Sequence, residues 1–283
     1  MIKQAIIPLA GLGTRLLPLT SVFAKELLPI NGKPGIEYIL DECIEAGIKE
    51  IIFIISKKKI MIKNYFYNDK FYKKIIKHKK DPRIIAEYKK ILKYRKMIKF
   101  VFQNKPLGTG DAVLKTQKFI KNKYFLMLLP DDLIVKKNCS KSMISINKKF
   151  NSSVMASMKV NKENVSRWGI FNIKRKINKN DFMIKSVFEK PSIKNAPSNN
   201  AVIGRYILPK TIFNQLKKLK PGKSNEIHIT DAIQLLINKN EKFIGHNFQG
   251  KYLDCGTMKG YINSSVEIYK IWNCVWLEQD MLV

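Results

Sequence analysis

Two glycines and two basic residues follow an apolar run near the start of the chain, in the segment "IIPLAGLGTRLLPLTSVFAKELLP" (residues 6–29). Gly11 and Gly13 can bring backbone N–H groups close to a phosphate, because glycine has no side chain to hold a ligand away. Arg15 and Lys25 add fixed positive charges, which the backbone of a turn cannot supply. The segment therefore predicts a site for a phosphorylated ligand, with a plain surface turn as the alternative.

Two familiar nucleotide-binding motifs do not fit this segment. A dinucleotide-binding fingerprint requires a third glycine where this chain has Leu16, and a P-loop requires Gly-Lys followed by Ser or Thr, which is absent. A dinucleotide-dependent oxidoreductase is therefore a disfavoured alternative.

Acidic residues follow two strand-like runs further along the chain. Asp131 and Asp132 come directly after "YFLMLLP", and Asp254 ends "YLD". Magnesium binds proteins through one or two carboxylates and completes its shell with waters and substrate phosphates. Asp131 is therefore a candidate magnesium ligand with Asp254 as its partner, whereas a sugar contact and a polar turn fit Asp132 equally well.

A glutamine ends another strand-like run. Gln103 is followed by Gly108 and Gly110 before an apparent helix, in "FQNKPLGTGDAVL". A glutamine amide both donates and accepts hydrogen bonds, which suits the imide edge of uracil, and a nearby glycine lets backbone groups take part. The alternative is a simple turn at the entry of a helix.

A carboxylate and a lysine adjoin in "SVFEKPS", again after a strand-like run. Glu189 can accept hydrogen bonds from sugar hydroxyls, and Lys190 can place a point charge on a sugar phosphate. Glu-Lys-Pro is also a common turn sequence. Trp168, in "RWGIF", fits packing better than stacking on a sugar.

The elements that must position these residues alternate between strand and helix in the first half of the chain. Apolar runs predict buried strands at 4–10, 50–56, 97–103 and 124–130, and an amphipathic helix at 35–47. Strands separated by helices imply a largely parallel sheet with right-handed crossovers. Ligands bind at the carboxyl ends of such strands, where the candidate residues lie.

The pattern changes from about Asn151. Shorter strands are predicted at 152–160, 168–173, 182–189 and 201–208, and helices near 209–218, 229–239 and 257–272. The predicted fold class is α/β: a Rossmann-like doubly wound mixed sheet, with a smaller, more antiparallel lobe that shares the same core.

The chain of 283 residues has a formal net charge of +31. Because Lys and Arg neutralise nucleic-acid phosphates, a basic nucleic-acid-binding protein is an alternative from a different class. The lysines are spread everywhere, however, together with many Ile and Asn, which is typical of compositional drift. In the densest cluster, Lys70–Lys99, apolar residues recur at helical spacing, which favours amphipathic helices with lysine-covered outer faces. We expect no specific nucleic-acid partner.

The apolar runs and the cysteines indicate where in the cell the protein is expected. No run reaches the ~20 residues of a membrane helix, and the first strand pattern starts too close to Met1 to leave room for a signal sequence. We therefore expect a cytoplasmic protein without a membrane partner. Reduced thiols are expected, because no C-x-x-C pair occurs among the four cysteines, Cys43, Cys139, Cys255 and Cys274.

The motifs, taken in order, resemble a known family. "GLGTRLLPLT" followed by "KELLP" resembles the signature of the sugar nucleotidyltransferases. Finer features resemble the bacterial UTP–glucose-1-phosphate uridylyltransferases: "PLAGLGTRLLPLT", "KELLPINGKPGIEYILDECIEAGI", "LGTGDAVL", "LLPDD", "FEKP", "APSNNAVIGRYIL", "EIHITDAI" and "DCGTMKGY". The resemblance covers nearly the whole chain. It departs from several relatives at Leu107 and Asp111, where they have lysine and histidine.

The resemblance implies a role for each matching position. Phosphate contacts that support catalysis are implied for Arg15, Lys25 and Lys190. Contacts with the base and nucleoside are implied for Ala10, Gly11, Glu26, Gln103 and Gly108. Contacts with the hexose are implied for Gly169 and Glu189, and Asp132 is kept as a further candidate. Metal binding is implied for Asp131 and Asp254.

The resemblance also implies the nucleotide-diphospho-sugar transferase type of fold and a reaction. With Mg²⁺, UMP would pass from UTP to α-D-glucose 1-phosphate by in-line attack, giving UDP-glucose and pyrophosphate. One domain, 1–283, would combine a nucleotide-binding half, 1–150, with a sugar-phosphate-binding half, 151–283, in a homo-oligomer, either dimer or tetramer. A sugar-1-phosphate nucleotidyltransferase that uses dTTP or GTP is the alternative within this class.

Overall fold

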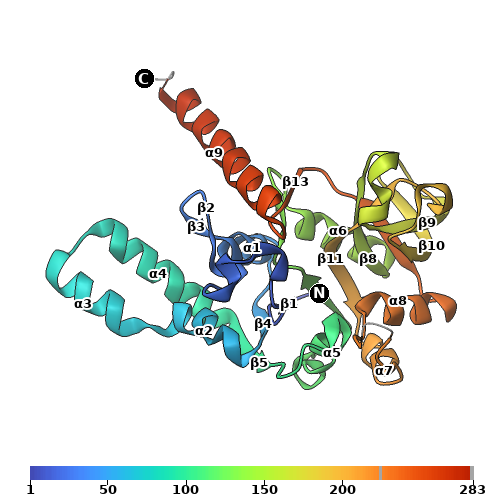
Figure 1. Cartoon of the computed structure of the whole chain (residues 1–283), viewed down its shortest axis with the longest axis horizontal. Helices are drawn as coiled ribbons and strands as arrows, with labels where there is room; N and C mark the ends of the chain where they lie inside the picture. The colour runs from blue at the N-terminus through green and yellow to red at the C-terminus, as the bar shows by residue number, and fades with distance from the viewer. Residues whose placement is uncertain (223–224, 281–283) are drawn as a thin grey trace.

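A nine-stranded mixed sheet forms the centre of the molecule, in the order β5-β4-β1-β6-β11-β8-β12-β10-β9 (Figure 1). The computed structural model describes residues 1–222 and 225–280. Four strands of the first half run parallel: β1 (Gln4–Pro8), β4 (Glu50–Ile55), β5 (Ile98–Phe102) and β6 (Tyr124–Leu128). The four strands predicted from apolar runs are therefore confirmed.

The second half continues the same sheet with a different strand direction. Its strands are β8 (Ser153–Lys159), β9 (Gly169–Lys176), β10 (Asp181–Glu189), β11 (Asn200–Pro209) and β12 (Phe243–Asn247). β11 is antiparallel to both β6 and β8, and β10 is antiparallel to both β9 and β12. The predicted change to a more antiparallel half is confirmed, although β12 was not predicted.

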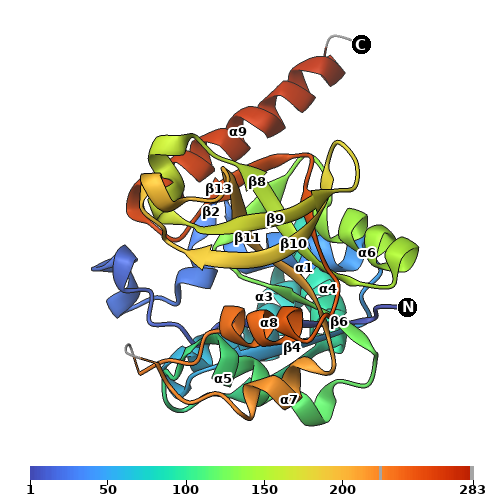
Figure 2. The same cartoon turned by 90° about the vertical axis from the view of Figure 1, so that its right-hand side faces the viewer.

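Helices cover both faces of the sheet (Figures 1 and 2). On one face pack α1 (Gly35–Glu45), α2 (Ile60–Tyr67) and α6 (Cys139–Phe150); on the other pack α5 (Gly108–Leu114), α7 (Ile212–Leu216) and α8 (Ile229–Asn238). Each face of the sheet has its own hydrophobic cluster. Because successive strand side chains point to opposite faces, Phe53 of β4 packs in the cluster with α1, α2 and α6, whereas Ile52 and Ile54 pack in the cluster with α5, α7 and α8. The doubly wound α/β prediction is confirmed.

Two helices between β4 and β5 extend away from the sheet, α3 (Asp69–Lys79) and α4 (Pro82–Met97) (Figure 1). The sequence predicted amphipathic helices here, and both helices form. α4 buries Ile91 and Tyr94, but α3 buries no residue, and Phe71 is 58% exposed. Tyr72 nevertheless packs against the core as a partly buried side chain, so the apolar face of α3 reaches only the margin of the core, because this helix lies beyond the edge of the sheet.

Two short two-stranded sheets lie outside the main sheet. β2 (Pro29–Ile30) pairs with β3 (Lys33–Pro34), and β7 (Asp132–Val135) pairs with β13 (Lys251–Asp254). The helix α9 (Met258–Asp280) follows β13 and projects from the body, as Figures 1 and 2 show. The β7–β13 pair joins the middle of the chain to its last quarter. Three candidate carboxylates lie in or next to it: Asp131, Asp132 and Asp254.

The described cysteine side chains are buried free thiols: Cys43, Cys139 and Cys255. Burial raises the pKa of each of these thiols, to about 12 in Cys255. Cys274 lies outside the described side chains. No helix in residues 1–222 and 225–280 has both the length and the apolar character needed to cross a membrane.

Candidate active site

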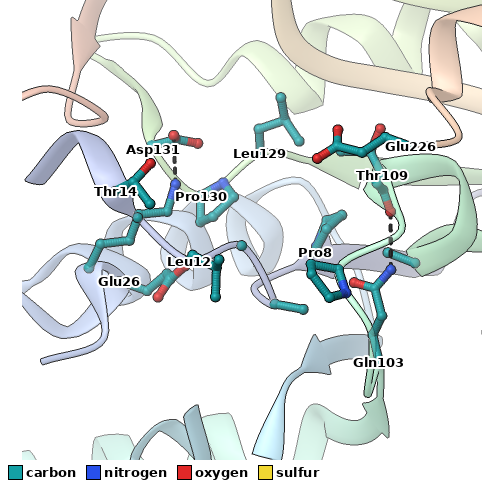
Figure 3. Close-up of a pocket in the computed structure, with 17 residues that line it drawn as sticks. Pro8, Leu12, Thr14, Glu26, Gln103, Thr109, Leu129, Pro130, Asp131 and Glu226 are labelled. Atoms are coloured by element: carbon teal, nitrogen blue, oxygen red, sulfur yellow. Dashed lines mark hydrogen bonds and ion pairs between the residues drawn. The ribbon is translucent and has the colours of Figure 1, made fainter. Parts of the chain in front are cut away.

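A first pocket of about 470 Å³ opens at the carboxyl ends of β1, β5 and β6. The chain passes from β1 to β4 and β5 on one side and then returns to β6 on the other, so this is the point where ligands bind in doubly wound sheets. Figure 3 shows side chains from segments far apart in the sequence facing one another across the pocket. Seven candidate residues line it: Ala10, Gly11, Lys25, Glu26, Gln103, Gly108 and Asp131.

The turn after β1 leaves its backbone open to a ligand. Within the described part of the chain, the N–H groups of residues 10–14 donate to no protein atom. A Cβ added at Gly11 would meet nothing within 4 Å, and Gly13 has a φ of 72°, where glycine is favoured. Leu16 is fully buried, so its side chain has a packing role in place of the third glycine of a dinucleotide fingerprint.

Two cations meet Asp131 at one end of the first pocket. Lys25 Nζ lies 2.7 Å from Asp131 Oδ2, and Arg15 Nη2 lies 3.4 Å from the same oxygen. Burial by itself would lower the pKa of Lys25, but the charges of Asp131 and Glu26 outweigh burial and raise it. Burial would likewise raise the pKa of Asp131, and Lys25 keeps it below its ordinary value. This end of the pocket therefore presents full charges of both signs at neutral pH.

Glu26 forms a buried ion pair with Lys59. It is 3% exposed, and Lys59 Nζ donates to its two oxygens at 2.7 and 2.8 Å. Burial lowers the pKa of Lys59, although Glu26 acts to raise it. Glu26 thus lies in the pocket wall with a protein partner. The sequence did not single out Lys59, because it is one of three consecutive lysines with no distinguishing pattern.

Gln103 lies at the opposite end of the first pocket from Asp131 (Figure 3). It is 4% exposed, and its amide nitrogen donates to the carbonyl oxygen of Gly108 at 3.1 Å. Gly108 has a φ of +89°, and a Cβ there would lie 2.6 Å from the carbonyl oxygen of Ile227. Only glycine therefore permits this approach, which holds the segment before α8 against the pocket.

A second pocket of about 290 Å³ adjoins the first, and Leu129 and Asp131 line both. It brings together Gly169 and Glu189 from neighbouring strands β9 and β10, which pair at these two residues. A Cβ at Gly169 would lie 3.2 Å from Glu189 Oε2, so glycine leaves room beside this carboxylate. Arg15, Asp132 and Trp168 also line the second pocket.

Lys190 follows Glu189 but does not line either pocket. It is exposed, has a φ of 44°, and donates its backbone N–H to the carbonyl oxygen of Trp168 at 3.0 Å. Trp168 also packs edge-on against Tyr252, with ring centroids 5.5 Å apart. The indole therefore has the packing role that the sequence favoured, and it forms part of the pocket wall as well.

Two carboxylates converge beside Gly256, a residue that the sequence did not single out. A Cβ built there would lie 2.8 Å from Asp131 Oδ2, 2.9 Å from Arg15 Nη2 and 3.2 Å from Asp254 Oδ1. Glycine therefore lets the two carboxylates approach one another beside the guanidinium of Arg15, and carboxylate oxygens suit Mg²⁺. No cluster of three or more His, Cys, Asp or Glu side chains in the described residues could hold a metal alone. The donor set fits an ion whose remaining ligands are phosphates and waters.

Asp132 links three segments. Its Oδ1 accepts a hydrogen bond from Tyr252 Oη at 2.6 Å, and its Oδ2 accepts one from the backbone N–H of Gly204 at 2.8 Å. Burial, together with the charge of Asp131, raises the pKa of Asp132 to about 6. Asp132 lines the second pocket, so a sugar contact stays a prediction, although both of its oxygens already accept hydrogen bonds from protein donors. Sequence reasoning missed Tyr252, since its partner lies 120 residues away.

A buried ion pair supports the loop that both pockets share. Arg205, in β11, is fully buried, and its Nη2 lies 2.8 Å from Glu42 Oε2 in α1. Arg205 Nη1 also donates to the carbonyl oxygen of Leu129 at 3.1 Å. The pair raises the pKa of Arg205 even though burial would lower it. An arginine inside the apolar strand "AVIGRYIL" was the available signal for this interaction.

Known proteins match this chain over most of its length. Residues 4–270 match the family model described as Nucleotidyl transferase. A protein of Streptococcus pyogenes serotype M3, named UTP–glucose-1-phosphate uridylyltransferase 2, is 36% identical over 273 residues, which cover 94% of this chain and 90% of that protein.

Solved structures share both the fold and much of the sequence. A UDP-glucose pyrophosphorylase complexed with UDP-glucose has a TM-score of 0.83 and 37% identity, over 95% of this chain and 99% of that one. The UTP-bound UGPase from Acinetobacter baumannii has a TM-score of 0.86 and 33% identity, over 95% of this chain and 93% of that one.

Proposed function

This chain belongs to the nucleotidyl transferase family, and we propose that it transfers UMP from UTP to α-D-glucose 1-phosphate, giving UDP-glucose and pyrophosphate. The named relative and the two solved structures support this choice of substrates. The single observation that carries the proposal is that the two pockets meet at Leu129 and Asp131. A nucleotide in the first pocket and a sugar phosphate in the second would therefore bring their phosphates to the same carboxylate.

The substrates divide between the two halves of the chain. In the half formed by residues 1–150, Gln103 and Gly108 read the base with Ala10 and Gly11, and Glu26 lies near the nucleoside. In the half formed by residues 151–283, Gly169 and Glu189 receive the hexose, and Asp132 from the first half completes the wall there. These assignments rest on the pocket linings and on the family resemblance.

The reaction is an in-line displacement. An oxygen of glucose 1-phosphate attacks the α-phosphorus of UTP, a new O–P bond forms, the bond from that phosphorus to the oxygen bridging to the β-phosphate breaks, and pyrophosphate leaves. The nucleophile is already anionic, so no general base is required. Arg15, Lys25 and Lys190 reduce the repulsion between the two anions, so catalysis consists of positioning and charge stabilisation.

Asp131 and Asp254 would hold Mg²⁺, because their carboxylates converge beside Gly256. Bound there, Mg²⁺ would act as a Lewis acid that neutralises phosphate charge. We also propose a homo-oligomer, either dimer or tetramer, and a cytoplasmic location; mass photometry of the purified protein and imaging of a tagged chain measure these two.

A substrate matrix tests the proposed function. Four nucleoside triphosphates are combined with several sugar 1-phosphates, and pyrophosphate release is measured with and without Mg²⁺. We expect UTP with glucose 1-phosphate to react fastest, and only with the metal. A preference for dTTP or GTP with another sugar would assign the chain to the alternative within its family, and no release from any pair would refute the proposal.

A further inference from the structure

The side-chain amide nitrogen of Gln103 faces two acceptors. It lies 2.7 Å from Asp111 Oδ2 and 3.1 Å from the carbonyl oxygen of Gly108. A carboxylate and a carbonyl oxygen accept hydrogen bonds but do not donate them. Turning the amide by 180° would place its own oxygen against both, so the NH₂ group is held toward α5.

This orientation leaves the amide oxygen for the ligand. Among the described residues, no donor binds Gln103 Oε1, while both hydrogens of the amide nitrogen are used. Figure 3 shows the nitrogen of Gln103 turned toward the Thr109 side and the oxygen turned toward the Pro8 side of the first pocket. The pocket therefore presents a fixed acceptor at this end.

Asp111 acts from behind Gln103. It lies in the first turn of α5, is 8% exposed, and does not line the pocket. Its other oxygen, Oδ1, lies 3.2 Å from Lys115 Nζ one turn further along the helix. Both oxygens thus face donors, and the carboxylate can influence a ligand only through Gln103.

We infer that Asp111 is a positioning residue that makes the first pocket select uracil over cytosine. Uracil carries an N–H at N3 that can donate to a fixed acceptor, whereas N3 of cytosine is itself an acceptor and would face Gln103 Oε1 without a proton between them. A freely rotating glutamine would serve both bases, since it can present either end. The inference rests on the proposed function, because it concerns how that nucleotide is read.

The test measures UTP and CTP binding by calorimetry, without sugar phosphate. The wild-type protein should bind UTP at least about tenfold tighter than CTP, the discrimination expected when a buried polar group loses its partner. Asp111→Asn keeps the shape but adds a donor, so the shorter of the two contacts no longer fixes the amide of Gln103 and only the carbonyl oxygen of Gly108 opposes its turning. We expect the ratio of UTP affinity to CTP affinity to fall by about tenfold, mainly through tighter CTP binding.

Two controls separate positioning from a structural role. Asp69→Asn makes the same change in the first turn of α3, where Asp69 also pairs with a basic residue, and it should leave the ratio unchanged. In a Gln103→Ala background, Asp111→Asn should have no further effect on the ratio, because the carboxylate acts through that amide.

Three outcomes would overturn the inference. The first is that the wild-type protein binds UTP and CTP equally. The second is that Asp111→Asn weakens the binding of both nucleotides by the same factor. The third is that Asp111→Asn still changes the ratio of UTP affinity to CTP affinity in the Gln103→Ala background. If Asp111→Asn does not fold, equal binding of UTP and CTP by the wild-type protein would still overturn the inference. Failure of the proposed function would look different, since the wild-type protein would then bind neither nucleotide.

Discussion

The two pockets differ in how completely the protein itself organises them. In the first pocket, Glu26 and Gln103 are 3% and 4% exposed and are held by Lys59 and Asp111. In the second, Glu189 is exposed, and neither its side chain nor that of the adjacent Lys190, which lines neither pocket, has a hydrogen bond or ion pair among the described residues. A preorganised site loses less entropy when its ligand binds. The first pocket, proposed for the nucleotide, should therefore bind its ligand alone, whereas the second, proposed for the sugar phosphate, should depend more on the charges that the substrates bring.

The largest expected effect comes from a residue that lines both pockets. Asp131→Asn removes a candidate metal ligand and the partner of Lys25, so pyrophosphate release should fall about a thousandfold or more, each tenfold corresponding to ~1.4 kcal/mol of barrier. Steady-state kinetics across a magnesium titration measure it, with the thermal melting point as a check of folding. Unchanged magnesium-dependent turnover would contradict the metal assignment.

The second largest effect is expected from the buried ion pair that supports the loop with Leu129 and Asp131, which both pockets share. Glu42→Gln leaves the charge of Arg205 buried without its counter-ion, so the free energy of unfolding should fall by about 3–5 kcal/mol. Urea denaturation measures this change. Lys99→Met is the control, because its ion pair with Glu50 is half-exposed and should contribute less than about 1 kcal/mol. Equal effects of the two substitutions would refute a supporting role for the buried pair.

Gln103→Ala tests the organised pocket. The substitution should weaken UTP binding and narrow the margin over other triphosphates by about 1–3 kcal/mol, because a buried polar edge of the base loses its partner. Calorimetry with each triphosphate, in the absence of sugar, measures the change. Sugar preference should stay the same, and an unaltered base preference would mean that uracil is read elsewhere.

Lys190→Ala tests the less organised pocket. The KM for glucose 1-phosphate should rise and kcat should fall, since the same charge is needed as the two phosphates approach, while UTP binding stays nearly intact. Kinetics with each substrate varied, together with UTP calorimetry, separate these effects. Loss of UTP binding with an unchanged dependence on sugar phosphate would reverse the assignment of the two pockets.

The smallest expected effect concerns charge outside both pockets. If most of the lysines behind the net charge of +31 are solvated and contact no partner, the protein should bind duplex DNA weakly. The complex should dissociate as the salt concentration is raised, because such affinity comes only from counterion release. Fluorescence anisotropy across a salt series measures this. Sequence-selective nanomolar binding at physiological salt would favour the nucleic-acid-binding alternative.

Sequence predicted the strands and the candidate residues at their ends, because both depend on local patterns. The apolar periodicity predicted β4 and β6, and polar residues after apolar runs predicted Gln103 and Asp131 as site residues. The sequence did not predict the side chains that hold the site residues and their loops in place. Arg205 lies 163 residues from Glu42 in the chain, and no local pattern encodes a pairing over that distance.

Exposure was the other feature that local pattern could not predict. The spacing of apolar residues correctly indicated helices in 70–99, but periodicity does not tell whether an apolar face meets a core. α3 lies beyond the sheet edge and has no fully buried residue, although its sequence is amphipathic, and its Tyr72 packs against the core only as a partly buried side chain. In the same way, "FEKP" indicated a carboxylate and a lysine at one site, whereas the structure places only Glu189 in the pocket wall.

The pairing of β7 with β13 has a consequence for how the molecule is made. It sets Asp132 opposite Asp254 and so brings Asp254 close to Asp131. These two candidate metal carboxylates, Asp131 and Asp254, come from parts of the chain that leave the ribosome far apart in time. Most of the first pocket's wall, from Pro8 to Asp131, can assemble while synthesis continues, since chains fold from their N-terminal part onward, and Glu226 completes it later. The phosphate end cannot be completed until Asp254 has emerged. A nascent chain would thus gain most of a nucleotide pocket before it could consume the nucleotide.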